Sequence, residues 1–206
     1  MYHTERMHSP YFTAIAQHLE GLPAAEDAIC GGRKLAAVAI ILRENGRGHE
    51  VLFIERARHP ADPWSGDIGF PGGRRDGRDR DLRQTAERET LEEVGIDLGE
   101  AAYLGRLSDV VGANLPVRVA CFVYGLISPV EMVFSPEVHD AFWFGLDELW
   151  EPHRQLVAAE VRFGERSLTA PAIRLHTRRP VLWGITYRLV GQFRQVWEDA
   201  QKRPGT

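Results

Sequence analysis

Three glutamates lie close together in the chain, at spacings that would gather their carboxylates on one helix face. Glu89, Glu92 and Glu93 are three and four residues apart, so at 3.6 residues per turn they share a face. Such carboxylates repel one another, and the last two would also stand at the negative end of the helix dipole. A divalent cation such as Mg²⁺ or Mn²⁺ would remove both penalties and connect the carboxylates to substrate phosphates. The alternative is a solvated acidic face, with Arg88 and Glu92 as an ion pair.

The residues around these glutamates predict the helix that would hold them. Residues 82–94 contain neither Gly nor Pro, and most of them favour helix. Asp81 is a suitable N-cap, and Gln84, three residues later, has the spacing of a capping box. Gly95 fits the position just after the last turn, where a left-handed residue ends many helices.

The string from Arg88 to Ile96, REx₂EEx-Gly-Ile preceded by Gly72-Gly73, resembles the Nudix box, GX₅EX₇REUXEEXGU with U aliphatic. This chain departs from that pattern in three ways. Fourteen residues separate Gly73 from Arg88 where the pattern has thirteen, Arg80 falls where a Glu is expected, and Thr90 stands at an aliphatic position. A longer gap that opens with Phe-Pro-Gly-Gly-Arg is similar to the coenzyme A diphosphatase branch of the family.

The resemblance implies a set of site residues. It assigns metal binding to the three glutamates and to a glycine carbonyl, and a further ligand or general base to a later loop. It also implies an arginine that orients a carboxylate, either Asp79 or Asp81, which lie in the region of the missing Glu. The predicted catalytic residues are Arg88, Glu89, Glu92, Glu93 and Glu137, and the predicted metal ligands are Glu89, Glu92, Glu93 and Gly73. The alternatives are a tight glycine turn and ordinary exposed loop carboxylates.

Substrate contacts are predicted on the loop that precedes the helix. Arg56 and the segment 66–73 partly resemble the coenzyme A signature, and residues 180–189 resemble a Trp-Gly-x-Thr stretch found late in the same branch. A 3′-phosphate requires an arginine or lysine, and a pantetheine arm requires a partly apolar groove. Trp64 would either stack on a base or belong to the core. The predicted substrate-binding residues are Arg56, Trp64, Phe70 and Arg74.

The remaining patterns predict an α/β fold, a Nudix-like α/β/α sandwich with a mixed central sheet. Strands are expected at 35–42, 51–55, 103–107, 117–127 and 142–144, a helical turn at 146–149, a late hairpin at 161–163 and 173–175, and a closing helix at 183–200. Ser9-Pro10 begins an N-terminal helix that ends near Gly21 and packs on the core or forms a dimer contact. The expected division is 1–33, helix and linker, and 34–206, the Nudix domain.

Composition limits the class of protein. The net charge of −4 does not indicate a general nucleic-acid binder, and no apolar run approaches the length of a membrane span. Cys30 and Cys121 show no CxxC spacing, so both are expected as reduced thiols in a cytoplasmic protein. The scattered histidines do not indicate zinc.

Together these observations predict a divalent-metal-dependent diphosphatase. The expected partner is a nucleoside diphosphate-linked small molecule, most consistently coenzyme A or its esters, and the expected products are a nucleoside monophosphate type and a phosphorylated second group. ADP-ribose or a nucleotide sugar is the alternative substrate. A degenerate Nudix domain that only binds nucleotides is the third hypothesis, although an intact set of three glutamates argues against it. We expect neither nucleic acid nor membrane as partners, and leave a homodimer open.

Overall fold

The structure is a computed structural model of the whole chain, and it describes residues 9–21, 33–46, 48–59, 64–113 and 116–202. Residues 22–32, which belong to the linker expected within 1–33 and include Cys30, lie outside these ranges. Cys121 is a free, buried thiol. None of the helices in the described ranges is long and apolar enough to cross a membrane.

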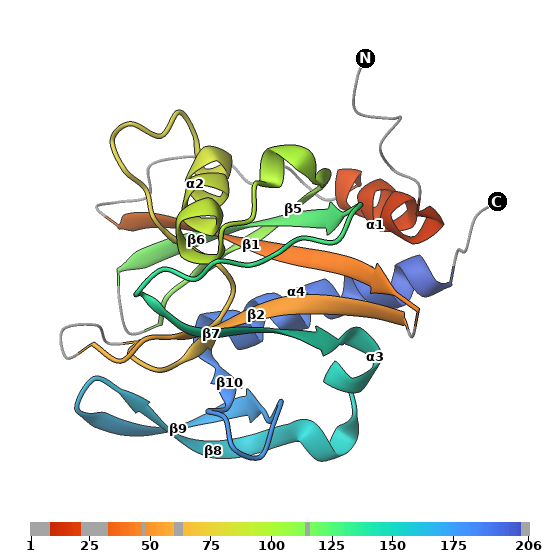
Figure 1. Cartoon of the computed structure of the whole chain (residues 1–206). Helices are drawn as coiled ribbons and strands as arrows, with labels where there is room; N and C mark the ends of the chain where they lie inside the picture. The colour runs from red at the N-terminus through yellow and green to blue at the C-terminus, as the bar shows by residue number, and fades with distance from the viewer. Residues whose placement is uncertain (1–8, 22–32, 47, 60–63, 114–115, 203–206) are drawn as a thin grey trace.

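The central sheet is mixed, as the sequence predicts (Figure 1). The strand order is β3 (Ile68–Gly69), β2 (Gly48–Arg56), β1 (Lys34–Asn45), β6 (Val117–Leu126) and β5 (Ala102–Val111). Two further strands join it: β4 (Gly72–Arg74) pairs with β1, and β7 (Val138–Gly145) pairs with β2. β1 and β6 run parallel, and the other pairs are antiparallel.

Helices cover both faces of this sheet and complete the α/β/α sandwich (Figure 1). One face packs against α1 (Pro10–Glu20) and α4 (Gly184–Gln201), and the other against α2 (Leu82–Val94). β1 and β6 are buried by helices on both sides, which explains their nearly continuous apolar runs. Short α3 (Leu146–Leu149) and the 3₁₀ turns η1 (Leu98–Glu100) and η2 (Pro152–Arg154) connect the strands.

α1 begins and ends as its sequence predicts. The Ser9 side chain accepts a hydrogen bond from the Phe12 amide, Pro10 is the first helical residue, and the helix ends at Gly21. Phe12 lies so close to β6 that a Cβ added at Gly125 would be 2.6 Å from its ring. The apolar face of α1 therefore packs against the sheet of the same chain. The division into residues 1–33 and 34–206 stays a prediction.

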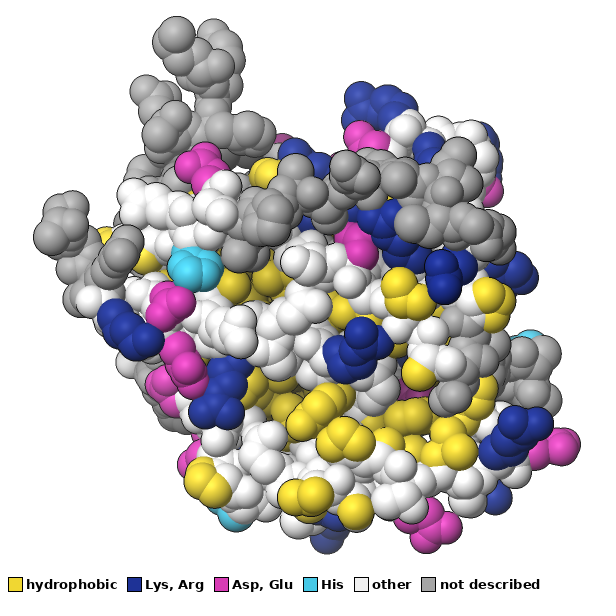
Figure 2. All heavy atoms as spheres, turned by 180° about the vertical axis from the view of Figure 1, so that it is seen from behind, with side chains coloured by type: hydrophobic (Ala, Val, Ile, Leu, Met, Phe, Trp, Pro, Cys, Tyr) yellow, Lys and Arg dark blue, Asp and Glu magenta, His cyan; other side chains and the backbone are white. Residues whose placement is uncertain are grey.

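A second sheet is larger than the sequence indicates. The late hairpin exists, but its strands are β8 (Gln155–Phe163) and β9 (Arg166–Ile173), and β10 (Leu182–Trp183) adds a third. Leu175, expected in the second strand, follows it and is fully buried in the main core. Its apolar character reflects core packing rather than strand pairing. Viewed from behind, apolar side chains gather over the lower half of the molecule (Figure 2).

Candidate active site

The ends of α2 are set by local hydrogen bonds. The Asp81 carboxylate accepts from the Gln84 amide at 2.8 Å, so Asp81 is the N-cap. The Gln84 side chain accepts from the Arg80 amide at 2.7 Å rather than from Asp81, so the predicted capping box is displaced by one residue. Gly95 adopts a left-handed conformation with φ of 73°, and its amide donates to the Leu91 carbonyl.

Two glycines bring β4 against both the sheet and α2. Gly72 has a φ of 147°, and a Cβ there would be 2.2 Å from the Ala37 carbonyl oxygen of β1. Its amide donates to Oε2 of Glu93 at 2.8 Å. A Cβ at Gly73 would be 2.4 Å from the carboxyl carbon of Glu89. The absent side chains thus let the β4 backbone touch two of the three glutamates.

Arg88 and Asp79 form a bidentate ion pair next to the three glutamates. Nε and Nη2 of Arg88 lie 3.0 and 3.1 Å from the two Asp79 oxygens. Asp79 also accepts from the Asp76 amide and the Thr85 hydroxyl, both at 2.9 Å. These donors hold the pKa of the buried Asp79 carboxyl well below its usual range, with the Arg88 hydrogen bonds as the largest cause. Of the two predicted partners of Arg88, Asp79 therefore forms the pair.

Arg88 also contacts the glutamates themselves. Its Nη2 lies 3.0 Å from Glu89, and its Nη1 lies 3.0 Å from Glu92. The same Nη2 donates to the Arg74 carbonyl at 3.3 Å, which links α2 to β4. Because the Arg88 guanidinium has five donors in a rigid plane, one side chain fixes the spacing of several carboxylates.

A later loop covers the C-terminal end of α2 and brings Glu137 to the cluster. The amides of Val133 and Ser135 donate to the Val94 and Glu93 carbonyls, both at 3.0 Å, and satisfy two acceptors that the helix leaves unpaired. The Ala57 amide, just after β2, donates to the Glu137 carbonyl at 2.8 Å. Glu137 is exposed, and its charge contributes to raising the pKa of both Glu89 and Glu93.

Several negatively charged carboxylates lie close together at this site. Burial raises the pKa of Glu93 to about 7, and Glu89 and Glu137 add to the rise, whereas the Gly72 amide and Arg56 oppose it. Burial also raises the pKa of Glu89, with Glu92 and Glu137 adding to it and Arg88 opposing. Two arginines near five carboxylates, the four glutamates and Asp79, therefore leave an excess of negative charge that an added cation would relieve.

The donor chemistry fits a hard divalent cation. Carboxylate oxygens and a glycine carbonyl are the ligands that Mg²⁺ and Mn²⁺ prefer. Within the described ranges, however, no three His, Cys, Asp or Glu side chains already stand in ligand positions. Glu92 turns toward Arg88 and its side chain is 59% exposed, and Oε1 of Glu93 lies 3.5 Å from Arg56. A cation held by all three glutamates would therefore require the Glu92 side chain to turn away from Arg88.

The raised pKa of Glu93 predicts a pH effect on stability in metal-free protein. Between about pH 4.5 and about pH 7 the folded protein holds a proton on Glu93 that the unfolded chain releases. Unfolding then becomes easier as the pH rises through this window. We expect the parent to lose stability, relative to Glu93→Gln, between these two pH values in denaturant titrations. Parallel curves for the two proteins would contradict the raised pKa.

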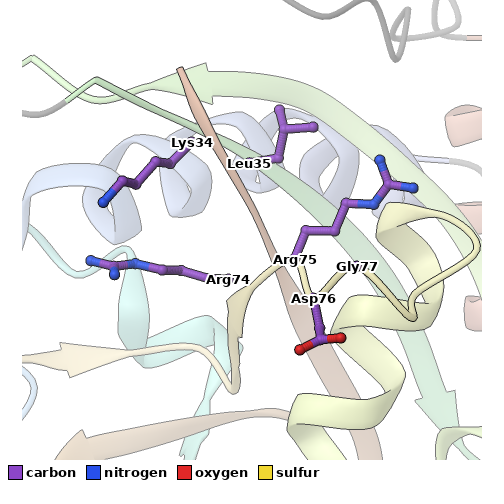
Figure 3. Close-up of a pocket in the computed structure, with 6 residues that line it drawn as sticks. All are labelled: Lys34, Leu35, Arg74, Arg75, Asp76 and Gly77. Atoms are coloured by element: carbon purple, nitrogen blue, oxygen red, sulfur yellow. The ribbon is translucent and has the colours of Figure 1, made fainter. Parts of the chain in front are cut away.

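The predicted substrate residues lie in different surroundings. Arg56 is partly buried and reaches the cluster through Glu93. Phe70 is 5% exposed and stacks on Phe53 at 5.1 Å between ring centroids, so it belongs to the core rather than to an open groove. Trp64 is half-buried beside the apolar cluster of Ala36, Val117 and Val119. Arg74 is exposed and lines a pocket on β4 (Figure 3).

The late Trp-Gly-x-Thr stretch packs on the loop before β4. Nε1 of Trp183 donates to Asp67 at 3.1 Å, and a Cβ at Gly69 would lie 3.8 Å from the Thr186 hydroxyl. These two segments, far apart in the chain, therefore meet at the residues just before Phe-Pro-Gly-Gly. The structure thus brings together segments 66–73 and 180–189, the two stretches that resemble the coenzyme A branch.

Comparison with known proteins gives one family. The model of the NUDIX domain matches residues 32–165, well over half of the chain. The chain belongs to the Nudix family. α2 is accordingly its Nudix helix, and Asp79 occupies, in contact with Arg88, the region where the Nudix box has a Glu.

Curated relatives and solved structures agree with this membership. A Schizosaccharomyces pombe protein is 40% identical over 113 residues, 51% of this chain and 34% of its own length. A human protein named as a mitochondrial coenzyme A diphosphatase is 31% identical over 138 residues, 66% of this chain and 58% of its own length. The chain thus spans less than two thirds of either relative. A MutT/Nudix family structure from Enterococcus faecalis shares the fold, with a TM-score of 0.57, 16% identity, and coverage of 94% of this chain and 71% of that one.

Sequence reasoning missed one residue of the carboxylate cluster and one residue of the pocket that Arg74 lines. Thr85 bonds Asp79 and stabilises the carboxylate that holds Arg88, yet a helix threonine gives no distinctive signal. Lys34 lines the same pocket as Arg74, although 40 positions separate the two in the chain. The pairing of β1 with β4 brings this lysine to the pocket.

Proposed function

We propose that the chain hydrolyses a diphosphate that links a nucleoside to a second group, using Mg²⁺ or Mn²⁺. Glu89, Glu92, Glu93 and the Gly73 carbonyl would hold the cation. The observation that carries this proposal is the contact of β4 with two carboxylates whose pKa values are raised by burial and by neighbouring glutamates. A protein that only bound nucleotides would gain nothing from carboxylates held this close together.

Each residue has a distinct part in this chemistry. The bound cation would neutralise phosphate oxygens and lower the pKa of a water molecule. Arg88 is held by Asp79 and lies against Glu89, so it would position the glutamates rather than contact the reacting atoms. Glu137 is the proposed general base, because its loop is tied to the end of the Nudix helix while its carboxylate stays exposed.

Coenzyme A or one of its esters is the proposed substrate. The human relative is named as a coenzyme A diphosphatase, and Asp67 and Gly69, just before the Phe-Pro-Gly-Gly-Arg segment, lie against Trp183 and Thr186 of the Trp-Gly-x-Thr stretch. Hydrolysis would give adenosine 3′,5′-bisphosphate and phosphopantetheine. A homodimer remains a prediction, and so does a cytoplasmic location, since the human relative is named as mitochondrial.

A substrate panel tests this assignment. Coenzyme A, ADP-ribose and a nucleotide sugar are incubated with the enzyme and Mg²⁺ or Mn²⁺, and products are resolved by chromatography. We expect the highest kcat/KM for coenzyme A. If ADP-ribose or the sugar nucleotide is cleaved at least about tenfold better, the coenzyme A assignment is wrong and the diphosphatase chemistry survives. Turnover of none of them would favour a binding module.

Gly73 provides a separate test of how the carboxylates are held. In Gly73→Ala the new methyl group would displace the Glu89 carboxylate, whose carbon lies 2.4 Å from the position that the added Cβ would take. We expect kcat/KM to fall by about 100-fold, as when a 1 Å misplacement disturbs a catalytic group. The matched control is Gly191→Ala on α4, where nothing lies within 4 Å of the added Cβ. Equal activity in the two variants would contradict close packing of Glu89 on β4.

A further inference from the structure

A pocket of about 440 Å³ lies at the start of β1 and the end of β4 and is lined by Lys34, Leu35, Arg74, Arg75, Asp76 and Gly77. Its two strands are paired with Ala36 opposite Arg74. Lys34 is two residues from Ala36, so it is the diagonal neighbour of Arg74 on the same face of the sheet, at roughly 7–8 Å. Figure 3 shows the Lys34 and Arg74 side chains extending to the same side.

These two cations differ from the other charged groups of the pocket. The Arg75 guanidinium donates to the Asp79 and Arg80 carbonyls, both at 3.2 Å, and extends away from Lys34 (Figure 3). The Asp76 carboxylate accepts from the backbone amide and from Nε of Arg78, at 2.9 and 3.0 Å. Among the described residues, neither Lys34 nor Arg74 has an ion pair or a side-chain hydrogen bond. Two neighbouring positive charges therefore lack a counter-ion within the described chain.

The pocket also has a defined relation to the carboxylate site. Gly73 faces Glu89 on the α2 side of the sheet, so alternation along β4 places Arg74 on the opposite side. β4 pairs with β1, and within the described residues no strand pairs with its other edge. A ligand that passes over this edge would reach the carboxylates with one group and the pocket with another.

We propose that Lys34 and Arg74 bind a phosphate monoester on the substrate, separate from the diphosphate that is cleaved. On a coenzyme A substrate this group is the 3′-phosphate, carried by the same ribose as the diphosphate. A dianion between an ammonium and a guanidinium accepts charge-assisted hydrogen bonds from both. Trp64 packs against the apolar cluster of Ala36, Val117 and Val119. The inference rests on the proposed function and adds the group that sets substrate preference.

The test compares coenzyme A with 3′-dephospho-coenzyme A. The ratio of their kcat/KM values is measured for the parent, Lys34→Gln, Arg74→Gln, the double variant, and Arg78→Gln as the control. Arg78 has the same charge and an exposed side chain, but its partner is Asp76. We expect the parent to prefer coenzyme A by about 10-fold or more, through KM, and the double variant to lose this preference. Arg78→Gln should retain it.

A binding measurement shows whether this inference has failed or the proposed function has failed. Adenosine 3′,5′-bisphosphate and 5′-AMP are titrated into the same proteins by calorimetry, which needs no turnover. We expect the parent to bind the bisphosphate about 10-fold more tightly than 5′-AMP and the double variant to bind them equally. If the double variant keeps the parent's preference for the 3′-phosphate, in turnover or in binding, or if the parent has no such preference, the pocket is not a phosphate site. If the parent cleaves neither coenzyme, the proposed function fails and the titration alone decides the pocket.

Discussion

Replacing Glu93 by glutamine is expected to lower kcat by at least about 100-fold and to leave the protein folded. The Glu93 carboxylate is 3% exposed and accepts the Gly72 amide, and glutamine can accept the same bond. What the variant loses is the negative charge that would hold a divalent cation against substrate phosphates. A 100-fold loss corresponds to about 2.7 kcal/mol of transition-state stabilisation, within the range expected for a metal's charge.

Stability distinguishes this loss from simple unfolding. Because burial, with smaller contributions from Glu89 and Glu137, raises the pKa of Glu93, removing its charge relieves a desolvation cost and repulsion in the metal-free protein. The melting temperature of Glu93→Gln should therefore equal or exceed that of the parent at pH 8. Glu160→Gln, an exposed acid on β8, is the matched control and should keep parental turnover. Near-parental kcat in Glu93→Gln at saturating Mg²⁺ would contradict the assigned role.

Arg88→Met should give the largest loss of stability among variants at this site. The methionine keeps part of the packing, but Asp79, whose side chain is 3% exposed, loses both hydrogen bonds from the guanidinium. Breaking a buried ion pair costs about 3–5 kcal/mol, and we expect roughly 2–3 here because Arg88 is 27% exposed. For a chain of this size the melting temperature falls by about 2–4 °C per kcal/mol.

A second substitution tests the physical reason. In Arg88→Met with Asp79→Asn the unpaired charge is gone, so part of the lost stability should return. Arg78→Met removes an arginine whose side chain is 90% exposed and should melt like the parent. If Arg88→Met melts like Arg78→Met, the Asp79 pair does not stabilise the fold.

Local signals made the Nudix helix predictable. Asp81, Gly95 and the absence of Gly and Pro between them set its ends through bonds within a few residues. The sequence could not decide between Asp79 and Asp81 as the partner of Arg88, because both lie in one short loop. The structure separates them, since Asp81 points to the Gln84 amide and Asp79 is buried beneath Arg88.

Contacts between distant segments were harder to predict. Phe70 looked like a groove residue because it adjoins the Gly-Gly turn, but it packs in the core against Phe53. Lys34 gained its place beside Arg74 from the pairing of β1 with β4, which no spacing in the sequence encodes. The third strand of the second sheet, Leu182–Trp183, is too short to show a period.

Metal dependence of product formation tests the central claim most directly. Coenzyme A is incubated with enzyme that has been treated with a chelator, and Mg²⁺ or Mn²⁺ is then titrated back. We predict adenosine 3′,5′-bisphosphate and phosphopantetheine in equal amounts, with a rate that rises from baseline to saturation as the cation is added, and no such rise with Glu93→Gln. A parental rate that stays unchanged in excess chelator, or a variant that responds to the cation as the parent does, would contradict a divalent-metal diphosphatase centred on these glutamates.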